Sequence, residues 1–145
     1  MKINTKVRYG LRAMLEIADP LNSTGTLQKD IALRQDIPLN YLDGIISGLR
    51  NAGLIVNFQG KSSGYLLARK VDEISVYDIY RAFEPDLQLV NCSCVTNECK
   101  RSFTCPAKDY WLGLTNQIKK IMENTCITSL LKPNQNSSLL ELIHV

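Results

Sequence analysis

The spacing of apolar residues in the first third of the chain predicts three helices. Over residues 5–18 they recur at steps of three and four, the period of one buried helical stripe. A short helix is expected over 27–34 with Thr26 as its N-cap, and a third begins at Pro38 and stops at Gly53. The expected inward positions are Val7, Leu11, Met14, Leu15, Ala18, Leu27, Ile31, Ala32, Leu42, Ile45, Ile46 and Leu49.

The second and third of these helices are joined by "RQDIP" and form a helix-turn-helix candidate. Two short segments rich in aliphatic and aromatic residues follow, "LIVNF" and "GYLLAR", with the polar turn "QGKSS" between them. This order is the winged-helix arrangement, in which the second helix enters the DNA major groove and the ribbon tip reaches the adjacent backbone or minor groove. Pattern and charge leave open a generic small α+β domain that binds no nucleic acid.

Two more helices are expected in the second half. In "EISVYDIYRAFEPD", Ser75 is the expected N-cap, Asp78 the third helical residue, and Val76, Ile79, Tyr80 and Phe83 share one face. After the stretch that ends at residue 105, a long helix is expected from Pro106 to about Leu131. Its apolar positions recur at near-heptad steps: Trp111, Leu114, Ile118, Ile121, Met122 and Ile127 or Thr128.

Such a helix would be about 38 Å long and would extend beyond the preceding domain. The simplest partner is the same helix of a second copy, which gives a homodimer able to bind a palindromic site. The fold class expected is mostly α with a small β-wing. Residues 1–84 form the winged-helix DNA-binding domain, 85–105 a cysteine-rich loop, 106–131 the dimerisation helix and 132–145 a tail.

Charge and hydropathy narrow the class of function. Residues 1–70 carry ten Lys and Arg against five Asp and Glu, whereas the remaining 75 residues balance at −2, and a basic N-terminal half suits a polyanionic partner. No apolar run approaches the roughly 18–20 residues that span a bilayer. Arg8, Arg12 and Glu16 interrupt the apolar core that a signal peptide would need. We therefore expect a cytoplasmic protein with no membrane partner. No nucleophile–base or carboxylate pair suggests an enzyme.

Four of the five cysteines lie in the short polar stretch "NCSCVTNECKRSFTC": Cys92, Cys94, Cys99 and Cys105. In a reducing compartment such clustering points to metal binding or redox chemistry. Four thiolates could hold a tetrahedral zinc ion, or act as a thiol switch beside Lys100 and Arg101. Cys126 is expected to pack in the core from the apolar side of the long helix, and His144, the one histidine, lies in the tail.

Five segments in this order resemble the Rrf2 family of bacterial transcription regulators: "MKINTKVRYGLRAMLEIA", "LNYLDGIISGLRNAGLI", "GKSSGYLLAR", "ISVYDIYRAFE" and the loop ending "CPAKDYW". The resemblance covers residues 1 to about 131. It implies a winged-helix fold, a dimer crossed through the long C-terminal helix, and operator binding.

The resemblance also implies an iron–sulfur cluster, because family members that carry one use three cysteines of this loop as ligands. The matching residues here are Cys92, Cys99 and Cys105. The cluster would sense redox state, nitric oxide or iron–sulfur status, and its gain, loss or modification would move the loop and the adjoining helix. Whether it holds two or four irons stays open. A cluster-free regulator, responding through a thiol switch, a zinc clip, a small molecule or a protein partner, is the alternative.

The fourth ligand departs from the family pattern. Some members place a histidine three residues after the last cysteine, where this chain has Lys108, and others use an aspartate in the first helix, where it has Arg8. Cys94 is the economical replacement. Glu98, Asp109, a residue of the partner subunit or an exogenous thiol are the alternatives.

For DNA, the resemblance implies that Asn40, Tyr41 and Asp43 contact base edges or position the recognition helix, since Asn suits adenine and Asp can accept from cytosine. The family wing usually has an arginine before a glycine-rich tip, where this chain has Gln59. Lys61 at the tip is therefore expected to contact a phosphate. The further phosphate-contact candidates are Lys2, Thr5, Lys6, Arg8 and Arg50.

Overall fold

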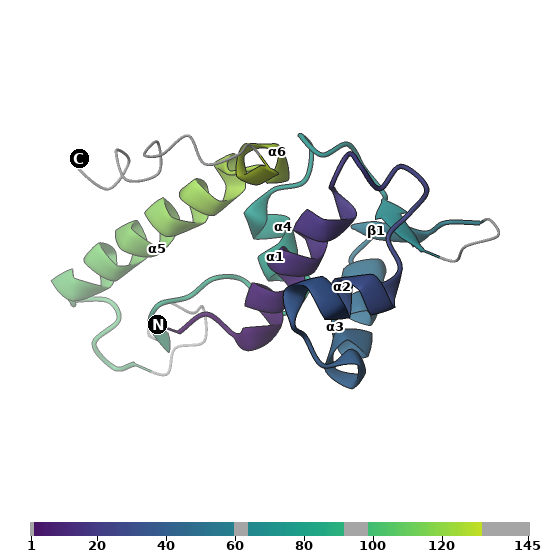
Figure 1. Ribbon diagram of the computed structural model, residues 1–145. Coiled ribbons are helices and arrows are strands. Elements are labelled where there is room, and N and C mark those ends of the chain that lie inside the picture. The colour runs from purple at the N-terminus through teal and green to yellow at the C-terminus, as the bar shows by residue number, and fades with distance from the viewer. Residues whose placement is uncertain (1, 60–63, 92–98, 132–145) are drawn as a thin grey trace.

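Within residues 2–59, 64–91 and 99–131, which the computed structural model describes, three helices are followed by a two-stranded ribbon and three further helices (Figure 1). The elements are α1 (Thr5–Ile17), α2 (Gln28–Gln35), α3 (Leu39–Asn51), β1 (Ile55–Asn57), β2 (Tyr65–Leu67), α4 (Val76–Arg81), α5 (Pro106–Asn124) and α6 (Ile127–Leu131). The expected mostly helical fold with a small β-wing is confirmed. None of these helices combines the length and apolarity that crossing a membrane requires. The expectations for Lys61, Cys92, Cys94, Glu98 and His144 fall outside the described residues.

The apolar stripes of α1, α2 and α3 meet in one core. Met14, Ile31, Leu42, Ile45 and Leu49 are fully buried, as their spacing predicts. Burial of each such side chain contributes about 1.5–3 kcal/mol. The core therefore fixes which face of α3 points outward.

The predicted start of α4 and end of α3 are confirmed. Ser75 Oγ accepts a hydrogen bond from the Asp78 N–H, while an Asp78 carboxylate oxygen accepts from the Ser75 N–H at 2.9 Å, which is a capping box. Gly53 follows α3 with φ of 71°, a left-handed conformation that favours glycine. Both signals are local, so the sequence predicts them well.

The N-cap expected at Thr26 is wrong. Thr26 pairs with Tyr65 in an antiparallel bridge, donating its N–H to the Tyr65 carbonyl at 3.0 Å and accepting from the Tyr65 N–H at 2.9 Å. Its hydroxyl donates to the Glu16 carbonyl, and α2 begins after Leu27 with no side-chain cap. The pairing connects the wing to the start of the helix-turn-helix.

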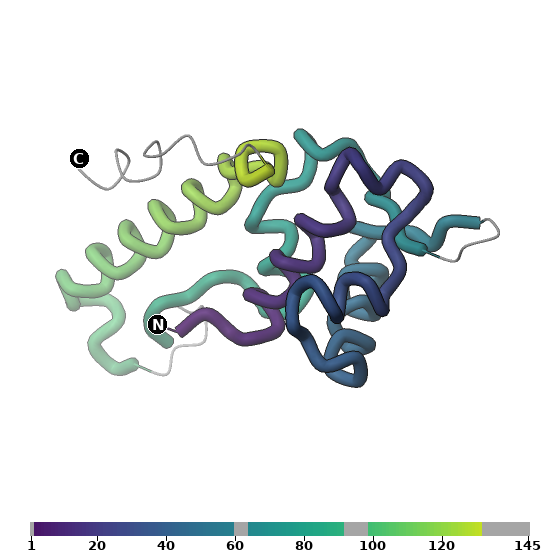
Figure 2. The backbone as a smooth tube through the Cα atoms, in the orientation of Figure 1, coloured from purple at the N-terminus to yellow at the C-terminus, as the bar shows by residue number. Residues whose placement is uncertain are grey.

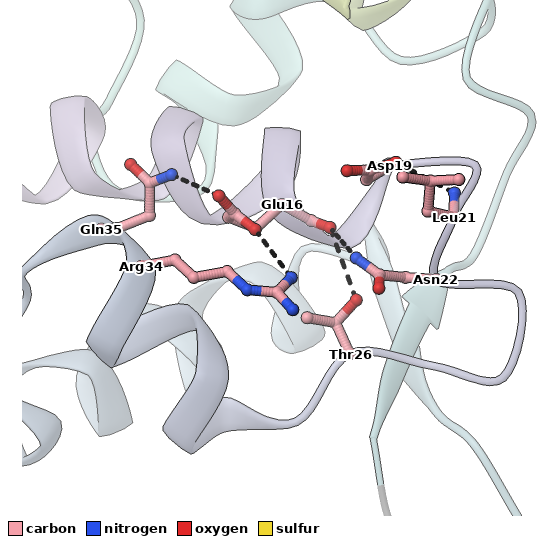
Figure 3. Close-up of polar contacts among 7 residues, drawn as sticks. All are labelled: Glu16, Asp19, Leu21, Asn22, Thr26, Arg34 and Gln35. Carbon is pink, nitrogen blue, oxygen red and sulfur yellow. Dashed lines mark hydrogen bonds and ion pairs between the residues drawn. The ribbon is translucent and has the colours of Figure 1, made fainter.

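Polar contacts around Glu16 join the C-terminal end of α1 to α2 and to the loop between them (Figure 3). The Glu16 carboxylate accepts a hydrogen bond from Gln35 Nε2 at 2.6 Å and pairs with Arg34 at 3.5 Å. The Glu16 carbonyl accepts from the Asn22 side chain at 3.1 Å. These contacts fix the angle between α1 and α2.

The wing is an antiparallel pair in which Ile55 lies opposite Leu67 and Asn57 opposite Tyr65. Just beyond β1, the Phe58 N–H donates to the Gly64 carbonyl at 2.8 Å. Gly64 is packed so closely that an added Cβ would lie 2.8 Å from the Gly25 backbone. The backbone trace shows the ribbon extending from the side of the head opposite to α5 (Figure 2).

The Phe83 ring lies between α1 and α3. A Cβ added to Gly48 of α3 would sit 2.5 Å from Phe83 Cε1, and one added to Gly10 of α1 would press on the opposite edge at Cε2. Each glycine costs its helix about 1 kcal/mol relative to alanine. The two glycines are needed here because they leave room for the ring.

The long helix expected over 106–131 is interrupted. α5 ends at Asn124, and Thr125 is extended with φ of −96° and ψ of 101°. Cys126 pairs with Ser75 in an antiparallel bridge, so it does not lie on a helix as expected. Ile127 then enters the core, fully buried, at the start of α6. Instead of continuing the helix, the chain pairs here with the strand-like segment before α4. α5 by itself is about 28 Å long.

Candidate DNA-binding face and cysteine loop

The outer face of α3 carries both polar and apolar side chains at its first turn, where Leu39 is 53% exposed. Leu42, Ile45, Ile46 and Leu49 face the core, whereas Asn40 and Asp43 are exposed. Open space surrounds the α carbon of Gly44, where an added Cβ would meet nothing within 4 Å. The face is therefore free to approach another molecule closely.

The Tyr41 ring of α3 packs against a side chain of α1. Its ring makes an edge-to-face contact with the Tyr9 ring at 5.6 Å, and the Arg12 guanidinium lies over Tyr9 at 5.2 Å. Arg12 Nε donates to the Gln35 side chain of α2 at 2.9 Å. Tyr41 is 37% exposed, so it both packs and remains accessible. Sequence reasoning missed the roles of Tyr9 and Arg12, because their partners lie on other helices.

Asp43 is not isolated on the α3 surface. The Gln28 side-chain amide at the start of α2 donates to Asp43 Oδ1, and the Tyr65 hydroxyl of the wing donates to Gln28 Oε1 at 3.5 Å. Gln28 thus joins α3, α2 and the wing. No local signal in the sequence marks Gln28.

The remaining described DNA candidates lie on three parts of the head. Lys2, Lys6 and Arg8 are exposed around the start of α1, and Thr5 accepts a hydrogen bond from Arg8 at 3.0 Å. The Tyr9–Tyr41 contact brings this part of α1 to the first turn of α3. Exposed Arg50 lies at the far end of α3, about 15 Å along the helix axis from Asn40. Exposed Gln59 follows the first strand of the wing.

The described part of the cysteine loop contains two free, half-buried thiols, Cys99 and Cys105. The Ser102 N–H donates to the Cys99 carbonyl at 3.0 Å, which makes a tight turn between them. Cys105 is the N-cap residue of α5 and Pro106 its first residue. The two thiols are therefore presented by a short turn and a helix start.

Lys108 is engaged with the loop backbone. Its ammonium donates to the Ser102 carbonyl at 3.3 Å, and its N–H donates to the Cys105 carbonyl at 3.2 Å. The Lys108 ammonium is therefore engaged with the backbone of the loop. Within residues 2–59, 64–91 and 99–131, no group of three or more His, Cys, Asp or Glu residues is arranged so that it could bind a metal ion. The Cys99 and Cys105 thiols nevertheless have the donor chemistry that an iron–sulfur cluster uses.

Asp86 links α5 to α4. It accepts hydrogen bonds from the Tyr77 hydroxyl and from Lys119 Nζ, the latter at 3.0 Å. The Tyr77 hydrogen bond, aided by Lys119, lowers the pKa of the Asp86 carboxyl, and the same contact with Asp86 raises the pKa of Lys119. Lys119 also lies 5.0 Å from the centre of the Tyr77 ring.

The apolar positions of α5 divide between two faces. Ile118 and Met122 pack against a buried cluster of Val7, Tyr80 and Leu87. Tyr110 and Ile121, eleven positions apart and therefore on one side of the helix, are 64% and 49% exposed. Trp111 is 37% exposed and lies in line with Ile118, seven positions further along the helix. The first face attaches α5 to the head, and the second is left uncovered within the described chain.

Both the sequence and the fold of this chain are similar to those of known transcription regulators. Residues 3–133 match the Rrf2 family model, described as an iron-dependent transcriptional regulator. The transcriptional regulator CymR of Bacillus subtilis (strain 168) is 32% identical over 130 residues, covering 90% of this chain and 89% of CymR. The structure of CymR, the global cysteine regulator of B. subtilis, superposes with a TM-score of 0.75 at 30% identity, covering 90% and 96% of the two chains.

Two further solved structures are similar. IscR of T. potens has a TM-score of 0.73 at 27% identity and covers 94% of each chain. The oxidised form of Staphylococcus aureus CymR has a TM-score of 0.73 at 31% identity, covering 94% of this chain and all of the other. The helix-turn-helix and wing described above are thus shared with these regulators.

Proposed function

The chain belongs to the Rrf2 family of transcriptional regulators, and we propose that it binds a palindromic operator as a homodimer whose DNA affinity depends on the cysteine loop. Its relatives are regulators that bind DNA and are not enzymes. The observation that carries the proposal is α3, which buries its apolar stripe and leaves Asn40 and Asp43 exposed. A recognition helix requires this division.

Three groups of residues divide the DNA contacts. Asn40 and Asp43 contact base edges in the major groove, and Tyr41 positions the first turn of α3. Arg50, Gln59 and Lys61 contact the DNA backbone beyond that turn. The backbone candidates around the start of α1 are Lys2, Thr5, Lys6 and Arg8. A helix N-terminus also favours a phosphate.

We assign an iron–sulfur cluster to the cysteine loop, with Cys92, Cys99 and Cys105 as thiolate ligands and Cys94 as the fourth. The free thiols of Cys99 and Cys105 and the description of the family as iron-dependent support this assignment. When bound, such a cluster supplies a redox-active group whose stability depends on its surroundings. The residues of the chain do the rest: the turn over 99–105 orients two thiols, and α5 begins directly after the second.

The second subunit is assigned to the exposed face of α5. Tyr110 and Ile121 are large, apolar and uncovered there, and the neighbouring Trp111 ring contacts the Tyr110 ring edge to face at 5.1 Å. Aromatic residues of this kind are enriched at protein interfaces. Pairing of α5 with its copy would set the separation of the two α3 helices.

The test is purification of the full chain without oxygen, followed by iron and acid-labile sulfide analysis. We expect a brown protein that loses iron in Cys99→Ser and Cys105→Ser. Cys126→Ser is the matched control and should keep its iron, because Cys126 pairs with Ser75 in the head. A colourless wild-type protein with stoichiometric zinc, or with no metal, would contradict the cluster assignment.

One specific observation favours a second candidate, a thiol switch without a cluster. Cys99 and Cys105 are free, Lys100 and Arg101 beside Cys99 are exposed, and a structural relative was solved in an oxidised form. Thiolates near basic groups are the reactive ones. Under this candidate, metal-free protein would change its operator affinity on mild oxidation, and Cys99→Ser would remove the change.

A further inference from the structure

Residues 83–87 follow α4 and contact α3, α5 and the start of α1. The Phe83 ring fills the space between α1 and α3 at Gly10 and Gly48. An aromatic ring enclosed in this way cannot shift without moving at least one of the two helices, since protein cores are close-packed. Phe83 therefore links this segment to the recognition helix.

The next residue links the segment to the start of α1. Glu84 accepts a hydrogen bond from Asn4 Nδ2 at 2.5 Å. Asn4 is the N-cap of α1, and its side-chain oxygen accepts from the Lys6 N–H at 2.9 Å. One asparagine thus binds Glu84 with its amide group and caps α1 with its oxygen. A change in Glu84 would alter the cap that orders the basic start of α1.

The far end of the segment contacts α5. Asp86 accepts from Lys119 Nζ of α5 at 3.0 Å and from the Tyr77 hydroxyl. Leu87 is 3% exposed and packs in the cluster that also contains Ile118 and Met122 of α5. A cavity of about 200 Å³ lies beside Glu84 and Leu87. The segment is therefore held by specific contacts and has space on one side.

We propose that residues 83–87 couple the position of α5 to the positions of α1 and α3, with Phe83, Glu84 and Asp86 as positioning residues. This inference rests on the proposed function, regulated DNA binding. A displacement of α5, which begins at the cysteine loop, moves Lys119 and hence Asp86. Because Asp86 is only three residues from Phe83, the displacement reaches the ring between α1 and α3. By reciprocity, DNA binding at α3 must also affect α5.

Hydrogen exchange measured by mass spectrometry tests this coupling in the reverse direction. The full chain is compared alone and bound to a duplex that wild-type protein has selected from a random-sequence library. We expect protection in α1 and α3, and also an altered exchange rate in α5, which contacts no DNA in the proposed arrangement. In Lys119→Met and in Asp86→Asn, the α5 change should disappear while α1 and α3 remain protected. The Lys119 and Asp86 side chains are 31% and 56% exposed, so neither substitution removes a core side chain.

Lys120→Met is the matched control, because Lys120 is the exposed neighbour of Lys119 on the same helix; it should behave as wild type. An unchanged α5 in the wild-type complex, despite protection of α3, would overturn the coupling and leave DNA binding intact. Persistence of the α5 change in both variants would also overturn it. If no duplex is selected at all, the proposed function fails, and the coupling fails with it.

Discussion

Gln28 of α2 donates its side-chain amide to Asp43 of α3. The contact holds an exposed carboxylate of α3 in one orientation, and the Tyr65 hydroxyl of the wing donates to the same glutamine. In the proposed DNA complex, Asp43 would meet a base with one acceptor oxygen already bonded to Gln28. Base selection by Asp43 would then depend on Gln28.

Replacing Gln28 should change base preference more than overall affinity. In Gln28→Ala, Asp43 loses its orientation, and discrimination at the base pairs facing the first turn of α3 should fall, where a good base contact is worth about 1–3 kcal/mol. Selection from a random duplex library measures the preference. Lys29→Ala is the control, because a phosphate contact there would alter the salt dependence without altering base preference. Identical selected sequences for Gln28→Ala and wild type would contradict the prediction.

Gly48→Ala should destabilise the protein by about 1–3 kcal/mol, because the new methyl would meet the Phe83 ring. Gly44→Ala in the same helix is the matched control. Nothing lies within 4 Å of its added Cβ, so a gain of up to about 1 kcal/mol is expected. Denaturant unfolding gives both values. The loss should be smaller in a Phe83→Leu background, and equal losses in both backgrounds would argue against the ring as the cause.

Signals within one element were predictable from the sequence. The stripe of α3, the Ser75–Asp78 capping box and the glycine stop at Gly53 each depend on residues a few positions apart, and all are present. Local periodicity and capping chemistry act before any tertiary contact forms, which explains why they can be predicted.

Contacts between distant segments were not predictable. The break after Asn124 depends on the pairing of Cys126 with Ser75, and the loss of the Thr26 cap depends on Tyr65. In both places a residue with acceptable helix or cap chemistry takes a backbone partner about 40 or 50 positions away. Gln28, Glu84 and Asp86 were missed for the same reason, since their partners lie on other elements.

Ile127→Ala should be among the most destabilising single changes in the C-terminal third. Ile127 is fully buried in the main core, and such truncations cost about 2–5 kcal/mol. Lys120→Ala on exposed α5 surface is the control and should change stability by less than about 0.5 kcal/mol. Thermal or denaturant unfolding measures the change in stability of each variant. A value for Ile127→Ala as small as that control would mean that α5 continues as one helix past Thr125.

The Asp86 contact should stabilise the protein only between acid and strongly alkaline pH. Its folded pKa is lowered from 3.8, so its contribution is present above that value and is lost as pH falls through the folded pKa. The pKa of Lys119 is raised from 10.5, so its contribution is lost only as pH rises beyond that value. Asp86→Asn should therefore lower the unfolding free energy at pH near 7, and its effect should vanish once the pH has fallen below the lowered folded pKa. A difference that does not vary with pH would exclude the ionic contact as its source.

Ile121→Glu should weaken dimer formation without unfolding the head. Ile121 is 49% exposed on the face of α5 that also carries Tyr110, whose ring contacts Trp111, and a carboxylate buried there without a partner would cost several kcal/mol. Sedimentation at micromolar concentration should show monomer. Emission from Trp111, the one tryptophan of the chain, should shift to longer wavelength as its partner leaves. Asn116→Glu, an exposed polar position on α5, should remain dimeric.

The monomeric Ile121→Glu variant should still bind a single half-site through α3 but lose the extra affinity for a palindrome, because two half-sites are then contacted independently. A palindrome bound as tightly as by wild type would remove α5 as the dimer interface.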